Sequence, residues 1–139
     1  MADILKRGTS MDGGIRVFAA VTTDLVNEAR KIHNTYPVAT AALGRTLTAG
    51  VLMSAAGLKN DTDSLTVQVK GDGPLGNIVV CADAELNVRG YVSNPFVDRP
   101  LNEKGKLDVG GDAAHFVEGA LARKHDAGCS GGGKMSDRR

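Results

Sequence analysis

The chain has few of the residues that usually mark a specialised class of protein. It has no tryptophan, two tyrosines and three phenylalanines in 139 residues, so its core must be built mainly from Val, Leu, Ile and Ala. Its formal net charge is only +1, which argues against nucleic acid as a partner because neither sign is in excess. The two cysteines form no CxxC pair, and no signal peptide is recognisable. These features predict one cytoplasmic domain in a reducing environment.

The sequence also lacks a recognisable catalytic or metal site. Nucleophilic catalysis needs Ser or Cys beside a base and an orienting acid, and no local signature of that kind is present. His115, His125 and Cys129 have irregular spacing, with no fourth zinc ligand nearby. Residues 71–76 fit G-x-G-x-x-G, but a strand pattern follows where a phosphate-binding helix would have to begin. We therefore predict no catalytic residue, cofactor or metal in this chain, and an enzyme is the least favoured class.

The stretch from Ser64 to Pro95 carries the clearest structural pattern. Leu65, Val67 and Val69 alternate with polar residues, as expected for a strand with one buried face. A cluster of glycines ends this strand, β-branched and apolar residues follow at 78–81, and a turn at 83–85 leads into a third strand over 86–92. The pattern predicts three consecutive antiparallel strands.

The N-terminal third predicts a hairpin and two helices. Residues 3–7 and 15–22 are the two strands of the hairpin, joined around Asp12-Gly13. A short amphipathic helix should begin at residues 22–24 and end near 33–34, with Leu25, Ala29 and Ile32 facing inward. A second, longer and more buried helix should follow Pro37 over 38–58.

The length of the second helix would suffice for a membrane span, but its composition favours a buried core helix. Arg45 lies near its centre, where a charged residue costs about 3 kcal/mol in a bilayer, and several Thr residues interrupt it. Gly44 and Gly50 would allow neighbouring backbone to approach closely. We expect an α+β fold, in which antiparallel sheets pack with a central buried helix and a shorter amphipathic helix, and no membrane association.

The character of the chain changes after residue 111. Residues 94–111 should form loops with at most one short strand around 106–109. Residues 112–125 could form a short helix, whereas 128–139 contain three successive glycines and mostly positive charges. We expect two parts: an incomplete domain over 1–111 and a divergent, largely disordered tail over 112–139.

Four motifs in order resemble one family. Residues 15–19, 39–49, 69–76 and 88–95 together resemble the N-terminal half of the redox-regulated 33 kDa chaperonin (HslO-type heat-shock holdase) family, and the resemblance covers residues 3–111. The residues of these motifs that we single out, with an expected structural role, are Arg45, Gly71, Gly73, Pro74, Gly76, Arg89, Gly90, Tyr91 and Pro95. Gly90 should mark a bulge or a close backbone contact.

The resemblance implies a cytosolic, ATP-independent chaperone that forms dimers and holds unfolding client proteins under oxidative or heat stress. Full-length members carry zinc on four cysteines in CxC and CxxC pairs, and oxidation of these thiolates releases the metal and exposes apolar surface. Neither Cys81 nor Cys129 matches a switch cysteine. We therefore expect a holdase without the zinc switch, through truncation, a frameshift or genuine divergence. The alternative is a self-associating structural module without chaperone activity.

Overall fold

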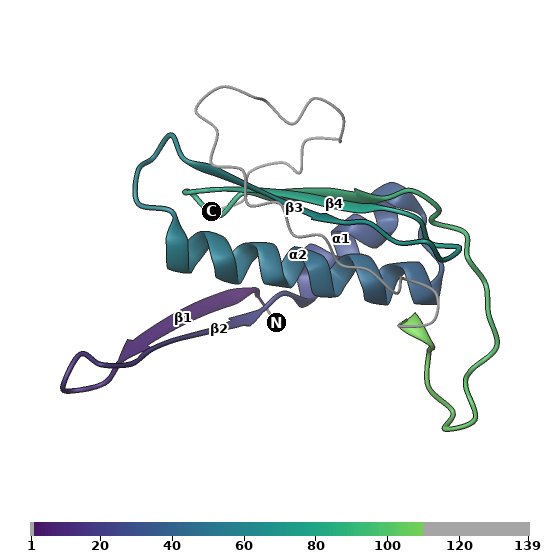
Figure 1. The fold of residues 1–139 in the computed structure, drawn as a ribbon, viewed down its shortest axis with the longest axis horizontal. Coiled ribbons are helices and arrows are strands. Elements are labelled where there is room, and N and C mark those ends of the chain that lie inside the picture. The colour runs from purple at the N-terminus through teal and green to yellow at the C-terminus, as the bar shows by residue number, and fades with distance from the viewer. Residues whose placement is uncertain (1, 110–139) are drawn as a thin grey trace.

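A computed structural model of the chain describes residues 2–109, and its elements follow the predicted order (Figure 1). The predictions for residues 112–139, including His115, His125 and Cys129, lie outside the described residues. The strands and helices are β1 (Ile4–Thr9), β2 (Arg16–Val21), α1 (Thr23–His33), α2 (Pro37–Gly57), β3 (Ser64–Val69), β4 (Ile78–Asp83) and β5 (Val88–Val92). The chain thus has the expected α+β fold.

The strands form two separate antiparallel sheets. β1 pairs with β2 in a two-stranded hairpin, and β3, β4 and β5 form a three-stranded sheet with β4 at its centre. The alternation in β3 has its expected cause, because Leu65, Val67 and Val69 lie on the face that packs against the core. The predicted third strand began two residues too early. Leu86 has a φ of 67° and lies in the turn before β5.

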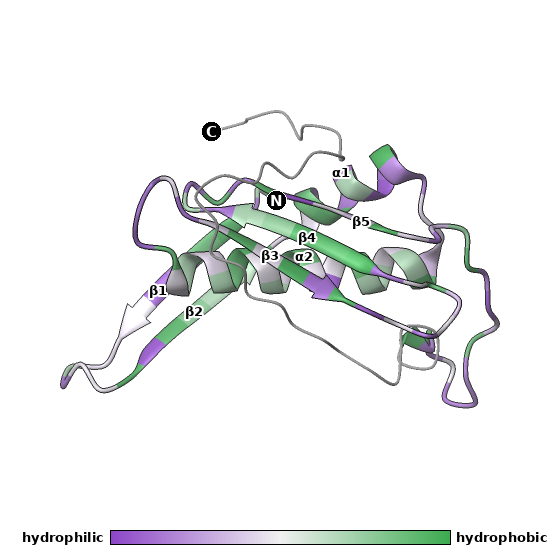
Figure 2. Cartoon of the chain, turned by 45° about the horizontal axis from the view of Figure 1, so that its top comes forward, coloured by the Kyte–Doolittle hydropathy of each residue, from purple (hydrophilic) through white to green (hydrophobic). Residues whose placement is uncertain are grey.

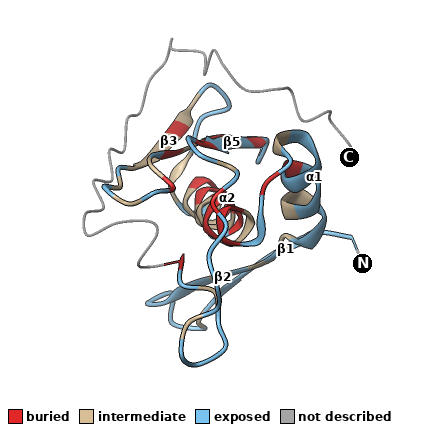
Figure 3. Ribbon diagram, turned by 90° about the vertical axis from the view of Figure 1, so that its right-hand side faces the viewer, coloured by how far each residue is buried: buried red, intermediate tan, exposed pale blue. Residues whose placement is uncertain are grey.

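Helix α2 is the centre of the fold. It lies between the three-stranded sheet and the β1–β2 hairpin (Figure 1). Many of its own residues are buried, as the end-on view shows (Figure 3). By length and composition α2 could cross a membrane, but half of its most apolar window is buried inside the protein. Its place between two sheets agrees with the predicted central buried helix.

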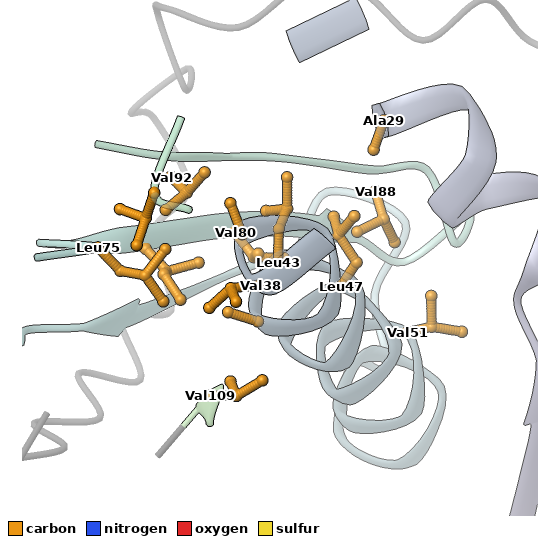
Figure 4. Close-up of a cluster of buried hydrophobic side chains, with 14 of the residues drawn as sticks. Ala29, Val38, Leu43, Leu47, Val51, Leu75, Val80, Val88, Val92 and Val109 are labelled. Atoms are coloured by element: carbon orange, nitrogen blue, oxygen red, sulfur yellow. The ribbon is translucent and has the colours of Figure 1, made fainter. Parts of the chain in front are cut away.

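The core is built from small and medium aliphatic side chains, as the shortage of aromatics requires. Leu43 and Leu47 of α2 meet Leu75, Ile78 and Val80 of the three-stranded sheet region, and all five are at most 2% exposed (Figure 4). Val109, the last described residue, is also buried in this cluster. Residues 93–108 contain no strand, and a turn closes there with a 2.8 Å hydrogen bond from the Asn102 amide to the Lys106 carbonyl.

Two glycines of α2 set how closely its neighbours approach. A Cβ at Gly50 would lie 2.8 Å from Cγ1 of Val80 in β4, and a Cβ at Gly44 would lie 2.9 Å from Cγ1 of Val26 in α1. Real Cβ atoms essentially never approach another atom that closely. The predicted close approach at both glycines is therefore confirmed.

The start of α1 is capped by a residue far away in sequence. Thr22 makes no side-chain bond to the helix amides, and its hydroxyl instead lies 2.7 Å from the hydroxyl of Thr48 in α2. The Asp3 carboxylate accepts hydrogen bonds from the backbone amides of Asp24 and Leu25, at 2.9 and 2.7 Å. A carboxylate in this position satisfies unpaired amides and interacts well with the helix dipole.

One expectation for α1 was wrong. Leu25 and Ala29 face the core, but Ile32 is 45% exposed. The helix ends directly after it, at His33, and Asn34 turns the chain with a φ of 50° in the left-handed region. Ile32 thus lies in the last turn of the helix, beyond the surface that packs against α2 and β5.

Candidate client-binding surface

The glycine-rich motif at 71–76 forms a turn that buries one leucine. The amide of Gly76 donates to the carbonyl of Gly73 at 3.0 Å, and Gly76 has a φ of 67°, which favours glycine. Leu75 between them is fully buried in the core. β4 begins at Ile78, so no helix N-terminus faces this turn and the motif has no phosphate-binding geometry.

Hydrogen bonds join this turn to the motif that ends at Pro95. The side-chain amide of Asn94 donates to the carbonyl of Pro74 at 3.1 Å, and the amide of Ser93 donates to the carbonyl of Asn77 at 2.8 Å. The carbonyl of Pro95 in turn accepts from the amide of Tyr36, directly before α2, at 2.8 Å. Gly73, Pro74, Gly76 and Pro95 therefore lie together as a structural junction, and Gly71 directly precedes it in the chain. Sequence reasoning did not identify Ser93, Asn94 or Tyr36 as its partners.

Gly90 of β5 lies in close contact with β4. A Cβ at this position would lie 2.7 Å from both the Val79 carbonyl oxygen and Cγ2 of Val80. The register continues through the Val80–Gly90 pair, so the glycine serves a close contact and not a bulge. Arg89 and Tyr91 lie on the sheet face opposite the core and are exposed, Tyr91 by 40%.

Arg45 is separate from both groups. It is exposed on α2 and lines a groove of about 750 Å³ between α1 and α2. The nine motif residues therefore occupy three places: the junction at 71–76 and 95, strand β5, and the helix groove. They do not form one site.

The outer face of the β1–β2 hairpin carries exposed apolar side chains. The register places Ile4, Val17 and Val21 on one face, whereas Leu5 and Ala20 lie on the other and pack against the core. Ile4, Val17 and Val21 are 44%, 58% and 38% exposed. Figure 2 shows the apolar character of β2 along most of its length. We call Ile4, Val17 and Val21 the hairpin outer face.

Two more apolar residues extend this exposed surface into the connecting loop. Met11 is fully exposed and Ile15 is 64% exposed. The loop itself is ordered by polar contacts: the Ser10 hydroxyl donates to the Asp12 carboxylate, which also accepts from the Gly14 amide at 3.1 Å. These hydrogen bonds, that of Ser10 first, hold the pKa of Asp12 below its ordinary value. The apolar side chains are thus presented on a defined loop.

The described part of the chain offers no metal-binding cluster. Within residues 2–109, no three His, Cys, Asp or Glu side chains gather in a way that could hold an ion. Cys81 is buried in β4, with its sulfur 3.5 Å from the Thr66 hydroxyl. Residues 2–109 therefore contain no set of ligands for the zinc that full-length members of the resembled family carry.

Comparisons with known proteins agree on one family. The family profile described as Hsp33 protein matches residues 3–134. The 33 kDa chaperonin of Ruminiclostridium cellulolyticum is 56% identical over 109 residues, or 78% of this chain. The 33 kDa chaperonin of Nostoc sp. is 56% identical over 111 residues, or 80% of this chain. Both relatives are named chaperonins.

A solved structure agrees with the fold as well. The crystal structure of the 33 kDa chaperonin from Thermotoga maritima superposes with a TM-score of 0.75 at 32% identity, over 86% of this chain and 44% of that one. This chain spans only 37% of the length of the Ruminiclostridium protein and 36% of that of the Nostoc protein. The surfaces described above therefore correspond to one part of those longer proteins.

Proposed function

Because the chain belongs to the Hsp33 family, we propose that it is a holdase chaperone, which binds unfolding proteins without ATP and limits their aggregation under heat or oxidative stress. The named relatives are chaperonins, and this supports a binding function in the cytoplasm, without catalysis.

The hairpin outer face is the observation that carries this proposal. Unfolding proteins expose apolar side chains, and burial of apolar surface stabilises a complex by roughly 25 cal/mol per Å². Ile4, Val17 and Val21 offer such surface on a two-stranded ribbon. Contiguous exposed apolar side chains on a folded protein are typical of a site that binds another protein.

We also propose that client binding by this chain does not depend on zinc release. Its only cysteines, Cys81 and Cys129, form neither a CxC nor a CxxC pair. A chain that exposes its apolar surface without a metal switch should be active as purified, and a zinc chelator should not change its activity.

The test is suppression of client aggregation, followed by light scattering. A heat-denatured client is mixed with the purified chain at an equimolar ratio, with and without a zinc chelator, and with an unrelated globular protein as control. We expect the chain to reduce scattering and the control protein to leave it unchanged. No reduction by the chain would exclude holdase activity for it.

Self-association is a second proposal, and it rests on the edges of the hairpin. Within the described residues β1 and β2 pair only with each other, so each strand has one edge without a strand partner. Such edges can pair with another chain. We expect light scattering after size-exclusion chromatography to give at least a dimer, whereas a monomer at all concentrations would contradict this proposal.

A further inference from the structure

A long hollow follows the contact between α1 and α2. Its larger part, of about 750 Å³, lies between the two helices, and an adjoining part of about 520 Å³ extends past the end of α1. Both parts share Asn27, Arg30 and Pro37. We call this continuous hollow the helix trough.

The wall of the trough formed by α2 is made mostly of small and apolar residues. Ala41, Gly44 and Ala49 lie along one stripe of the helix, and Leu52 extends the stripe toward its C-terminal end. Gly44 also lies in close contact with Val26 of α1, which a Cβ at this position would meet at 2.9 Å. Small side chains here keep the hollow open and give it an apolar surface.

The charges that line the trough are all positive. Arg30 and Lys31 come from α1 and Arg45 from α2, and none of the lining residues is acidic. Arg30 and Arg45 are exposed, and in the described part of the chain neither guanidinium has an ion pair or side-chain hydrogen bond. Two guanidinium groups thus border an apolar surface with their donors available to a ligand.

An exposed aromatic pair lies at the end of the trough. Tyr36, which lines the smaller part, contacts Phe96 edge to face, with 5.8 Å between ring centroids and 74° between ring planes. The two rings are 42% and 56% exposed. Exposed aromatic rings beside cationic groups are typical of surfaces that bind other proteins.

We propose that the helix trough binds client segments in which apolar side chains alternate with carboxylates. This inference rests on the proposed holdase function and assigns it a second, charge-selective surface. Apolar side chains of the segment would lie along Ala41 and Leu52, and its carboxylates would pair with Arg30 and Arg45. The chain's own residues 128–139 do not complement the trough, because they carry three basic residues and one acidic residue.

The test compares two labelled peptides of equal length and identical apolar residues, one with Glu and the other with Lys at the polar positions. Fluorescence anisotropy gives their affinities for the purified chain. Exposed ion pairs are individually weak, so two of them predict a preference of roughly 2- to 30-fold for the acidic peptide. The double variant R30Q/R45Q should lose this preference, and R30E/R45E should reverse it in favour of the Lys peptide.

A matched control changes net charge by the same amount elsewhere. Lys59 and Lys104 are exposed and line neither part of the trough, so K59E/K104E should bind the acidic peptide nearly as the unmodified chain does. All substituted residues are exposed, and circular dichroism of each variant confirms that it folds.

Three results would overturn the inference: equal affinities for the two peptides, a preference that persists in R30E/R45E, or an equal loss in K59E/K104E. Conversion of a dimeric chain into a monomer by R30E/R45E, with no peptide preference, would assign the trough to self-association instead. The aggregation assay separates this inference from the proposed function. If the chain suppresses aggregation but shows no charge preference, the holdase function stands and the proposed role of the trough in peptide binding is refuted.

Discussion

The packing of α2 against β4 leads to a quantitative prediction at Gly50. Ala has a higher helix propensity than Gly by about 1 kcal/mol in a helix interior, so Gly50→Ala would stabilise an isolated helix. In the folded protein the new Cβ would lie 2.8 Å from Cγ1 of Val80, which is itself fully buried. Forcing an extra carbon into a packed core costs about 1–3 kcal/mol. We therefore expect the packing term to cancel or exceed the propensity gain, for a net loss of stability of about 0–2 kcal/mol.

Gly57→Ala is the matched control in the same helix. A Cβ at Gly57 would meet no atom within 4 Å, so this substitution keeps the propensity gain, reduced by its position at the helix end. Urea denaturation followed by circular dichroism measures both variants. We expect G57A to be more stable than G50A, by up to about 3 kcal/mol, which is the upper limit of the packing cost. If G50A were as stable as G57A, the close approach of α2 to β4 would be refuted.

Three further predictions concern the hairpin, the first helix and the turn before β5. Asp3→Ala should lower the free energy of unfolding by about 1 kcal/mol through loss of the α1 cap, whereas Asp61→Ala, an exposed residue in a loop, should change it little in the same denaturation experiment. The pKa of Asp12 should lie below its ordinary value of 3.8 in a carbon-detected NMR titration, and Ser10→Ala should raise it toward that value. Because the folded-state pKa is lowered, the contribution of this carboxylate to stability is present above pH 3.8 and is lost as the pH falls through the lower folded-state pKa. Leu86→Gly should be neutral or stabilising by up to about 1 kcal/mol, since Leu86 has a φ of 67°, and a clear loss of thermal stability would contradict this.

The features that could be predicted from the sequence are those set by neighbouring residues. The alternation over Leu65, Val67 and Val69 predicts β3, and Pro37 predicts the start of α2, because both patterns depend on contacts within one element. The family could also be predicted, because the resemblance to the 33 kDa chaperonins depends on short motifs of neighbouring residues. The comparisons with known proteins confirm this family.

The features that could not be predicted depend on which segments meet in three dimensions. Asp3 caps α1 from 21 positions away, and nothing in its own sequence context indicates this. The helix trough lies along the contact of α1 with α2, which includes Gly44 and Val26, and the sequence of neither helix alone contains that contact. Ile32 fits the helical period, but the helix ends before a partner surface reaches it.

The most direct test of the central claim is a comparison of two lysine substitutions in the aggregation assay. Val17→Lys places a charge on the hairpin outer face, and Thr9→Lys places the same charge on the opposite face of the same hairpin. Both residues are exposed, so both variants should fold. If the hairpin outer face binds clients, V17K should protect a heat-denatured client less well than the unmodified chain, and T9K should protect it equally well. Equal protection by both variants would contradict the claim that clients bind there.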